Sequence, residues 1–190
     1  MSVEAFAVST GIVALSEIGD KTQLLALLLA ARFRKPLPII AGIFVATVAN
    51  HALAALLGTW LTRVIDPTWL RWGLGASFLA VAAWMLLPDE VDAGAVQTRG
   101  HWGVFGVTVI AFFLAEMGDK TQIATVMLAA QYNALVAVTA GTTLGMMLAN
   151  VPAVLLGDKA VKFVPIEWVH RITAFVFALL GVLVLAGVGL

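Results

Sequence analysis

The chain has 190 residues, of which 62% are hydrophobic and 12% are charged, with a mean hydropathy of +1.02 and a formal net charge of zero. A soluble domain is roughly half apolar and a quarter charged, so this composition indicates a membrane protein. Neutral charge without a dense basic tract excludes nucleic-acid binding, and the absence of cysteine excludes disulfides, thiolate metal sites and a cysteine nucleophile.

The apolar runs predict an all-α fold with six transmembrane helices, because each run is long enough to cross a hydrocarbon core of roughly 30 Å. In chain order the predicted spans cover residues 4–31, 37–60, 69–87, 102–130, 134–157 and 166–189. The first segment carries Glu17, Asp20 and Lys21 where a signal peptide would be apolar. We therefore expect it to be a permanent part of the membrane domain.

The sequence contains an internal repeat. Pairing each residue i of 1–91 with residue i+99, without gaps, gives 21 identical pairs. Six of these pairs form the motif Glu-x-Gly-Asp-Lys-Thr-Gln, which occupies residues 17–23 and 116–122. This predicts two homologous units, 1–91 and 101–190, joined by an acidic and polar connector at 92–100.

Each predicted unit contains three spans, an odd number, so the second unit enters the membrane from the opposite side. Inverted repeats recur in secondary transporters, whose substrate sites lie near the bilayer midplane. One side of the membrane would carry most basic loop residues: Arg32, Arg34, Lys35, Arg99, Lys159, Lys162 and Arg171, against Arg63 and Arg71 on the other. The positive-inside rule then predicts that both termini lie outside the cytoplasm. We expect a multi-pass protein of the inner (plasma) membrane.

The repeated motif places charge in the middle of predicted spans. On a continuous helix Glu17, Asp20 and Gln23 would share one face, with Lys21 beside them and Thr22 turned away. The second copy repeats this pattern with Glu116, Asp119, Lys120, Thr121 and Gln122. Six mid-membrane charges would cost on the order of 15–20 kcal/mol if left unpaired, so we expect mutual pairing or a ligand.

If the two copies meet, four carboxylates and two lysines give a net charge of minus two. One divalent cation or two protons would neutralise this group, which suits it to exchanging one for the other. Hard oxygen ligands favour Mg²⁺, Ca²⁺ or Mn²⁺, and six could come from the four acids and the amides of Gln23 and Gln122. At Gly19 and Gly118 we expect a close helix crossing or a local break.

Other interpretations stay open. An i, i+4 Glu–Lys pair can be a purely structural staple, although two copies, each with a second acid, make this less favoured. On the second and fifth predicted spans, the pathway candidates are Thr47, Asn50, His51, Thr143 and Asn150. Hydrogen bonding between helices explains them equally well, and a single histidine does not make a metal site.

Both motif copies resemble a family of six-span transporters with two Glu-x-Gly-Asp-(Lys/Arg)-(Ser/Thr) motifs, which includes bacterial manganese exporters and Golgi calcium and manganese transporters of eukaryotes. The resemblance covers essentially the whole chain. It implies cation/proton exchange with Mn²⁺ and Ca²⁺ as the usual substrates. It also implies cation-ligand roles for Glu17, Asp20, Glu116 and Asp119, and leaves those of Lys21, Lys120, Thr22 and Thr121 undefined.

We therefore expect a Mn²⁺ exporter that works as a cation/proton antiporter by alternating access, in which Glu17 and Glu116 both bind the cation and carry protons. The alternatives are a Ca²⁺/H⁺ antiporter, an organic-cation transporter, an intramembrane acid-dependent hydrolase, or a structural membrane module. The hydrolase is less favoured because one active site seldom needs two identical inverted motifs. The expected partners are divalent cations, protons and the lipid bilayer; no cofactor is expected, and a homo-oligomer is left open.

Overall fold

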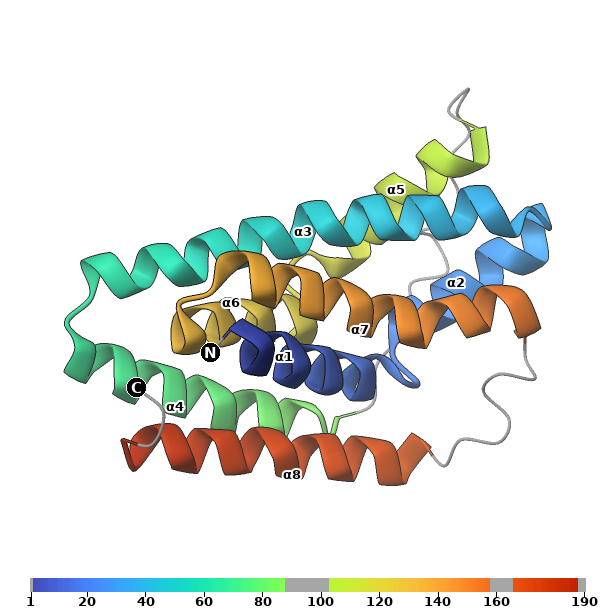
Figure 1. Cartoon of the computed structure of the whole chain (residues 1–190). Helices are drawn as coiled ribbons and strands as arrows, with labels where there is room; N and C mark the ends of the chain where they lie inside the picture. The colour runs from blue at the N-terminus through green and yellow to red at the C-terminus, as the bar shows by residue number, and fades with distance from the viewer. Residues whose placement is uncertain (1, 88–102, 158–165, 188–190) are drawn as a thin grey trace.

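The computed structural model describes residues 2–87, 103–157 and 166–187, and every regular element in these ranges is helical (Figure 1). The all-α prediction is confirmed. In chain order, the helices of the described ranges are α1 (Ser2–Glu17), α2 (Lys21–Phe33), α3 (Pro36–Val64), α4 (Pro67–Trp84), α5 (Gly103–Glu116), α6 (Lys120–Tyr132), α7 (Leu135–Leu156) and α8 (Ile166–Leu185). The connector at 92–100 and the basic residues Arg99, Lys159 and Lys162 lie outside the described residues.

Two of the predicted spans are not continuous helices. The segment 4–31 is divided into α1 and α2, and the segment 102–130 is divided into α5 and α6. Each break falls inside a motif copy, at Gly19 and Gly118. Of the two alternatives expected at these glycines, a close helix crossing or a local break, the structure shows the break. The prediction that Glu17, Asp20 and Gln23 share one face of a single helix was therefore wrong.

The residues of the motif explain why the helix breaks there. Gly19 and Gly118 have φ values of 83° and 76°, in the left-handed region that glycine enters without a steric cost. The next residue, Asp20 or Asp119, is the N-cap of the following helix, with extended φ and ψ. An Asp followed three residues later by Gln is a helix-start pattern, so the sequence carried a signal for this break.

The helices of the two halves correspond at the same offset of 99 residues that relates the sequences. Residues 21–33 form α2 and residues 120–132 form α6. Both of these helices end in a residue with positive φ, Arg34 at 52° and Asn133 at 45°. Local backbone geometry thus follows the sequence repeat, including at positions where the residue types differ.

The packing of the helices brings the two halves together. α1 packs along α7, and α5 packs along α3, which also contacts α6 and α7. α4 and α8 lie side by side as a separate pair at one edge of the bundle (Figure 1). The two broken segments are thereby held against the long helices of the opposite half, with the motif breaks in the interior.

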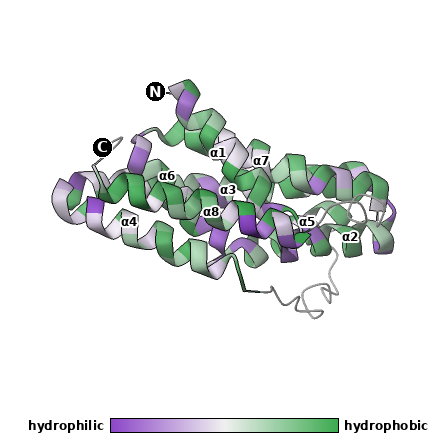
Figure 2. Cartoon of the chain, turned by 90° about the horizontal axis from the view of Figure 1, so that it is seen from below, coloured by the Kyte–Doolittle hydropathy of each residue, from purple (hydrophilic) through white to green (hydrophobic). Residues whose placement is uncertain are grey.

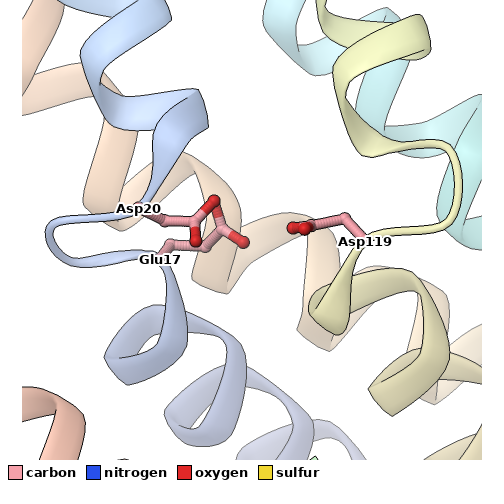
Figure 3. Close-up of side chains that lie close together, drawn as sticks. All are labelled: Glu17, Asp20 and Asp119. Atoms are coloured by element: carbon pink, nitrogen blue, oxygen red, sulfur yellow. The ribbon is translucent and has the colours of Figure 1, made fainter. Parts of the chain in front are cut away.

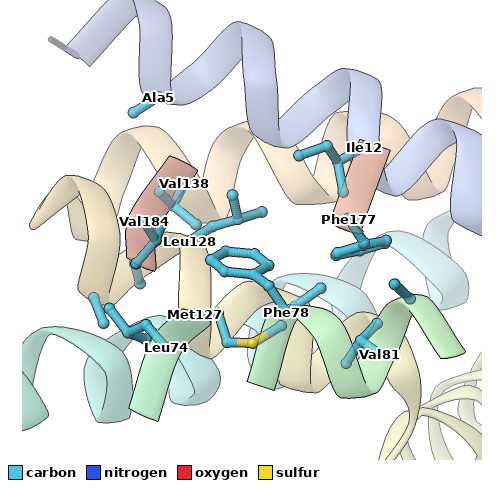
Figure 4. Packing of buried hydrophobic residues seen from close by; sticks show 14 of the residues in the cluster. Ala5, Ile12, Leu74, Phe78, Val81, Met127, Leu128, Val138, Phe177 and Val184 are labelled. Carbon is cyan, nitrogen blue, oxygen red and sulfur yellow. The ribbon is translucent and has the colours of Figure 1, made fainter. Parts of the chain in front are cut away.

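Aromatic and aliphatic side chains fill the space between the α4/α8 pair and the rest of the bundle. Phe78 and Phe177, equivalent positions of the repeat, have ring centroids 6.2 Å apart and are almost fully buried. Leu74, Val184 and Met127 belong to the same cluster (Figure 4). Aromatic pairs at this distance add to the stability supplied by burial of apolar area.

The outer surface of the bundle is apolar. Leu53 is 57% exposed, Leu148 55% and Phe175 68%, and most of the ribbon has hydrophobic colours (Figure 2). Within the described ranges, α3, α7 and α8 are long and apolar enough to cross a membrane by length and composition. Large apolar side chains on the outside and charged side chains inside are what a lipid environment favours.

Gly145 allows α7 to approach α1 closely. A Cβ atom at this position would lie 2.7 Å from the carbonyl oxygen of Thr10 and 2.8 Å from the amide nitrogen of Ala14. Both are backbone atoms of α1, which cannot rotate away as a side chain could. Small residues at such contacts let membrane helices pack backbone to backbone.

Gly145→Ala is therefore expected to destabilise the protein by about 1–3 kcal/mol, because α1 and α7 would have to separate. Gly73→Ala is the matched control, since a Cβ there would have no other atom within 4 Å. In α4 this control should be neutral or stabilising by up to about 1 kcal/mol. Thermal unfolding of the two purified variants in detergent measures the difference; equal melting temperatures would contradict the close contact.

Candidate cation site

The two helix breaks face each other in the interior and form the centre of the candidate site. Glu17 and Asp20 come from the first break and Asp119 from the second (Figure 3). One carboxylate oxygen from each of these three residues lies within 4.8 Å of the others, and all three side chains are buried. Three acids from two distant parts of the chain thus point toward one position.

Glu17 is held by hydroxyl groups from both motif copies. Its side chain is 0% exposed, and Thr22 donates a hydrogen bond of 2.5 Å to its Oε2 atom. Thr121 donates to its Oε1 atom. The prediction that Thr22 turns away from the acids was wrong, because the break between α1 and α2 reorients the start of α2.

Ion pairs cross between the two motif copies. The Nζ atom of Lys21 lies 2.8 Å from Oδ1 of Asp119, and the Nζ atom of Lys120 lies 3.7 Å from Oδ1 of Asp20. Each lysine therefore pairs with the aspartate of the other half. The expected mutual pairing of mid-membrane charges has this crossed form, in which each ammonium group lies beside a carboxylate of the other half.

Glu116 occupies a different position from the other three acids. It does not belong to the three-acid group, and its Oε2 atom lies 3.9 Å from Nε2 of His51 on α3. Both side chains are 0% exposed. The structure therefore brings Glu17, Asp20 and Asp119 together and places Glu116 beside them, toward His51.

The two motif glutamines support the helix breaks. Oε1 of Gln23 accepts a hydrogen bond of 2.9 Å from the backbone N–H of Gly19, and Oε1 of Gln122 accepts one of 2.7 Å from Gly118. These bonds satisfy amide groups that the interrupted helix leaves without partners. The amide oxygens expected to be cation ligands thus have another role in this structure.

The amino groups of the same glutamines reach the long helices of the opposite half. Nε2 of Gln23 donates to the carbonyl oxygen of Ala149 at 3.0 Å, and Nε2 of Gln122 donates to Oδ1 of Asn50 at 2.6 Å. Asn50 in turn donates to the carbonyl oxygen of Phe113 at 3.3 Å. Among the predicted pathway residues, Asn50 therefore joins the motif directly.

The remaining pathway candidates on α3 and α7 are buried. Thr47 and Asn150 are 0% exposed and Thr143 is 5% exposed. Asn150 donates its hydrogen bonds within α7, to the carbonyl oxygen and the sulfur of Met146. Oγ1 of Thr47, Oγ1 of Thr143 and Oδ1 of Asn150 have no hydrogen-bond partner in the structure. Buried oxygens without a partner are uncommon in native proteins, so these three can still accept a hydrogen bond from water.

The arrangement can bind a divalent cation through carboxylate oxygens. The four buried carboxylates, with the two ammonium groups that pair with two of them, carry a net charge of minus two when all are ionised. Oxygen ligands of this kind suit Mg²⁺, Ca²⁺ and Mn²⁺. Because protons and cations compete for the same carboxylates, binding of the cation releases protons.

Comparison with protein families gives one match that covers nearly the whole chain. The family model described as "Divalent cation/proton antiporter GDT1" matches residues 5–93 and 104–188. The two matched stretches begin 99 residues apart, which is the offset of the sequence repeat.

The similar proteins include one named as a manganese exporter and others named as GDT1-like proteins. A Vibrio cholerae protein named "Putative manganese exporter" is 54% identical over 183 residues, covering 95% of this chain and 89% of its own length. A GDT1-like protein of Synechocystis is 29% identical, covering 94% of this chain and 95% of its own length. A GDT1-like protein 4 of Oryza sativa is 30% identical, and the match covers 82% of this chain and 63% of the length of the rice protein. No solved structure matches the chain.

Proposed function

The chain belongs to the GDT1 family of divalent cation/proton antiporters, and on this premise we propose that it exports Mn²⁺ from the cytoplasm in exchange for protons. It is a multi-pass membrane transporter and not an enzyme, so the hydrolase interpretation is set aside. The choice of Mn²⁺ is supported by the name of the Vibrio cholerae relative, with which this chain shares 54% identity.

The proposal rests on one observation: acidic side chains of both motif copies lie close together in the interior of the bundle. Glu17 and Asp20 of the first copy and Asp119 of the second converge within 4.8 Å, at a depth where charge without a ligand is costly. In the proposed mechanism these three acids are cation ligands and Glu116 completes the set from the second break. A structural staple would need only the Lys–Asp pairs and would leave Glu17 without a use.

The topology proposed for the transporter is six spans in two inverted units, residues 1–91 and 101–190. In this topology α1 with α2, and α5 with α6, each form one broken span, while α3, α4, α7 and α8 are unbroken. Broken helices at the midplane are the usual sites of substrate binding in transporters with inverted repeats. Both termini would lie outside the cytoplasm, and alternating access would follow from exchange of the two units' roles.

In the proposed exchange cycle, the two motif lysines compete with Mn²⁺ for the aspartate oxygens. In the structure the ammonium group of Lys21 forms an ion pair with Oδ1 of Asp119, and that of Lys120 forms one with Oδ1 of Asp20. An incoming Mn²⁺ would attract the same oxygens, so the lysines would withdraw when the cation binds. When Mn²⁺ leaves, protons on the glutamates and the two lysines would again balance the four carboxylates.

Flux into proteoliposomes tests the function. With the purified protein and an imposed pH gradient, Mn²⁺ is expected to accumulate in the compartment with the higher proton concentration, with two protons moved per Mn²⁺. The control is the same protein with Asp20→Asn and Asp119→Asn together. Mn²⁺ movement unaffected by the pH gradient would contradict antiport, and Ca²⁺ movement without Mn²⁺ movement would favour the Ca²⁺/H⁺ alternative.

A further inference from the structure

His51 and Glu116 form a buried pair whose polar atoms lack partners. Both ring nitrogens of His51 and both carboxylate oxygens of Glu116 are buried, and none of these four atoms has a hydrogen-bond partner in the structure. Native proteins satisfy more than about nine in ten buried polar groups. Four unsatisfied atoms on two facing side chains therefore point to a ligand between them.

The distance between the two groups supports a shared ligand over a direct bond. Nε2 of His51 and Oε2 of Glu116 are 3.9 Å apart, whereas a charge-assisted hydrogen bond would measure about 2.7–2.9 Å. Two ligand atoms bound to one divalent ion at roughly 2.0–2.4 Å each lie roughly 3–4.5 Å apart, depending on the angle at the ion. The observed separation falls within this interval.

This pair breaks the symmetry of the repeat. The position equivalent to His51 in the second half is Asn150, whose side chain donates to Met146 of its own helix. The position equivalent to Glu116 is Glu17, which accepts bonds from Thr22 and Thr121. One glutamate is thus held by hydroxyl groups, and the other faces an imidazole.

The difference matters chemically because imidazole nitrogen and carboxylate oxygen have different metal preferences. Ca²⁺ and Mg²⁺ take oxygen ligands almost exclusively, whereas first-row transition metals also accept imidazole. Sites built only from carboxylates distinguish poorly between Mn²⁺ and Ca²⁺. A nitrogen ligand added to one side of the site gives Mn²⁺ an advantage that Ca²⁺ cannot use.

We propose that His51 is a specificity-determining residue, which together with Glu116 forms a mixed nitrogen and oxygen subsite that selects Mn²⁺ over Ca²⁺. This inference rests on the proposed function as a divalent cation exporter. Thr47 lies one turn before His51 on α3, and its buried Oγ1 atom also lacks a partner. It would contribute a further oxygen on the same face of the helix.

Pulsed electron paramagnetic resonance of the wild-type protein loaded with Mn²⁺ alone tests the subsite without any substitution. Nitrogen from a coordinated imidazole modulates the electron spin echo of Mn²⁺, and we expect this modulation in the wild type. Bound Mn²⁺ without it would overturn the inference and leave the proposed function standing. A protein that binds and transports no divalent cation would instead overturn the proposed function.

His51→Asn tests selectivity, because it places at this position the residue that the second half carries. In proteoliposomes the ratio of Mn²⁺ to Ca²⁺ transport is expected to fall at least about tenfold, with loss of the nitrogen modulation. His170→Asn on α8 is the matched control and should keep both properties. An unchanged transport ratio in a folded His51→Asn protein would overturn the role of His51, since a purely structural histidine would lower both fluxes together.

Discussion

Glu17→Gln is expected to reduce Mn²⁺ transport at least about 100-fold while the protein remains folded and membrane-inserted. Glutamine keeps the size of the side chain and an oxygen that can accept one of the two threonine hydroxyl groups. It removes a negative charge and a ligand oxygen from a fully buried three-acid group. Loss of metal flux in proteoliposomes, together with an unchanged or raised melting temperature, is the expected result.

The control for this substitution is Glu4→Gln, which removes the same charge from an exposed position in the first turn of α1. It should transport as the wild type does. Growth of cells in excess Mn²⁺ gives an independent measurement: cells that express Glu17→Gln should lose protection, and so should cells that express Glu116→Gln. If both variants protect cells as well as the wild type, the assignment of the acids as ligands is incorrect.

Asp119→Asn is expected to lower the stability of the protein as well as its transport. The substitution removes the charge that Lys21 faces at 2.8 Å, and breaking a buried ion pair costs about 3–5 kcal/mol. The Lys21 side chain is 29% exposed, which places the expected cost near the lower end of this range. Asparagine is as good an N-cap as aspartate, so the start of α6 should be preserved.

Removing both charges separates the stability effect from the transport effect. The double variant Lys21→Met and Asp119→Asn should regain most of the lost stability, because no unpaired charge remains, but it should not regain transport. The four proteins of this double-mutant cycle are compared by thermal unfolding and by Mn²⁺ flux. Transport by the double variant would show that Asp119 is not a ligand, and additive losses of stability would show that the ion pair contributes nothing.

Much of the architecture could be predicted because it depends on patterns that a membrane imposes strongly. The apolar runs indicated helices, and the match of Glu17 with Glu116 and Asp20 with Asp119 indicated that the two motif copies would be built alike. Family membership then follows from the same motif, which is specific because six polar or glycine positions recur in one register. These inferences need only spacing and composition.

The local course of the chain at the motif could not be settled in the same way. A glycine inside an apolar segment permits both a close helix crossing and a break, and the two differ in where every following side chain points. Thr22 was for this reason assigned to the wrong face. The pairing of His51 with Glu116 depends on how α3 packs against the end of α5, and no spacing within a single helix encodes that contact.

The crossed ion pairs also limit how the two halves can diverge. Two ion pairs join one half to the other, Lys21 with Asp119 and Lys120 with Asp20. Two hydrogen bonds do the same, from Thr121 to Glu17 and from Gln122 to Asn50. Neither half by itself contains all the acids of the proposed binding site, much as one subunit of an obligate dimer lacks part of a shared site. A change of charge in one half alters the surroundings of the other, so the stability lost by such a change is expected to be regained through a second substitution about a hundred residues away along the chain.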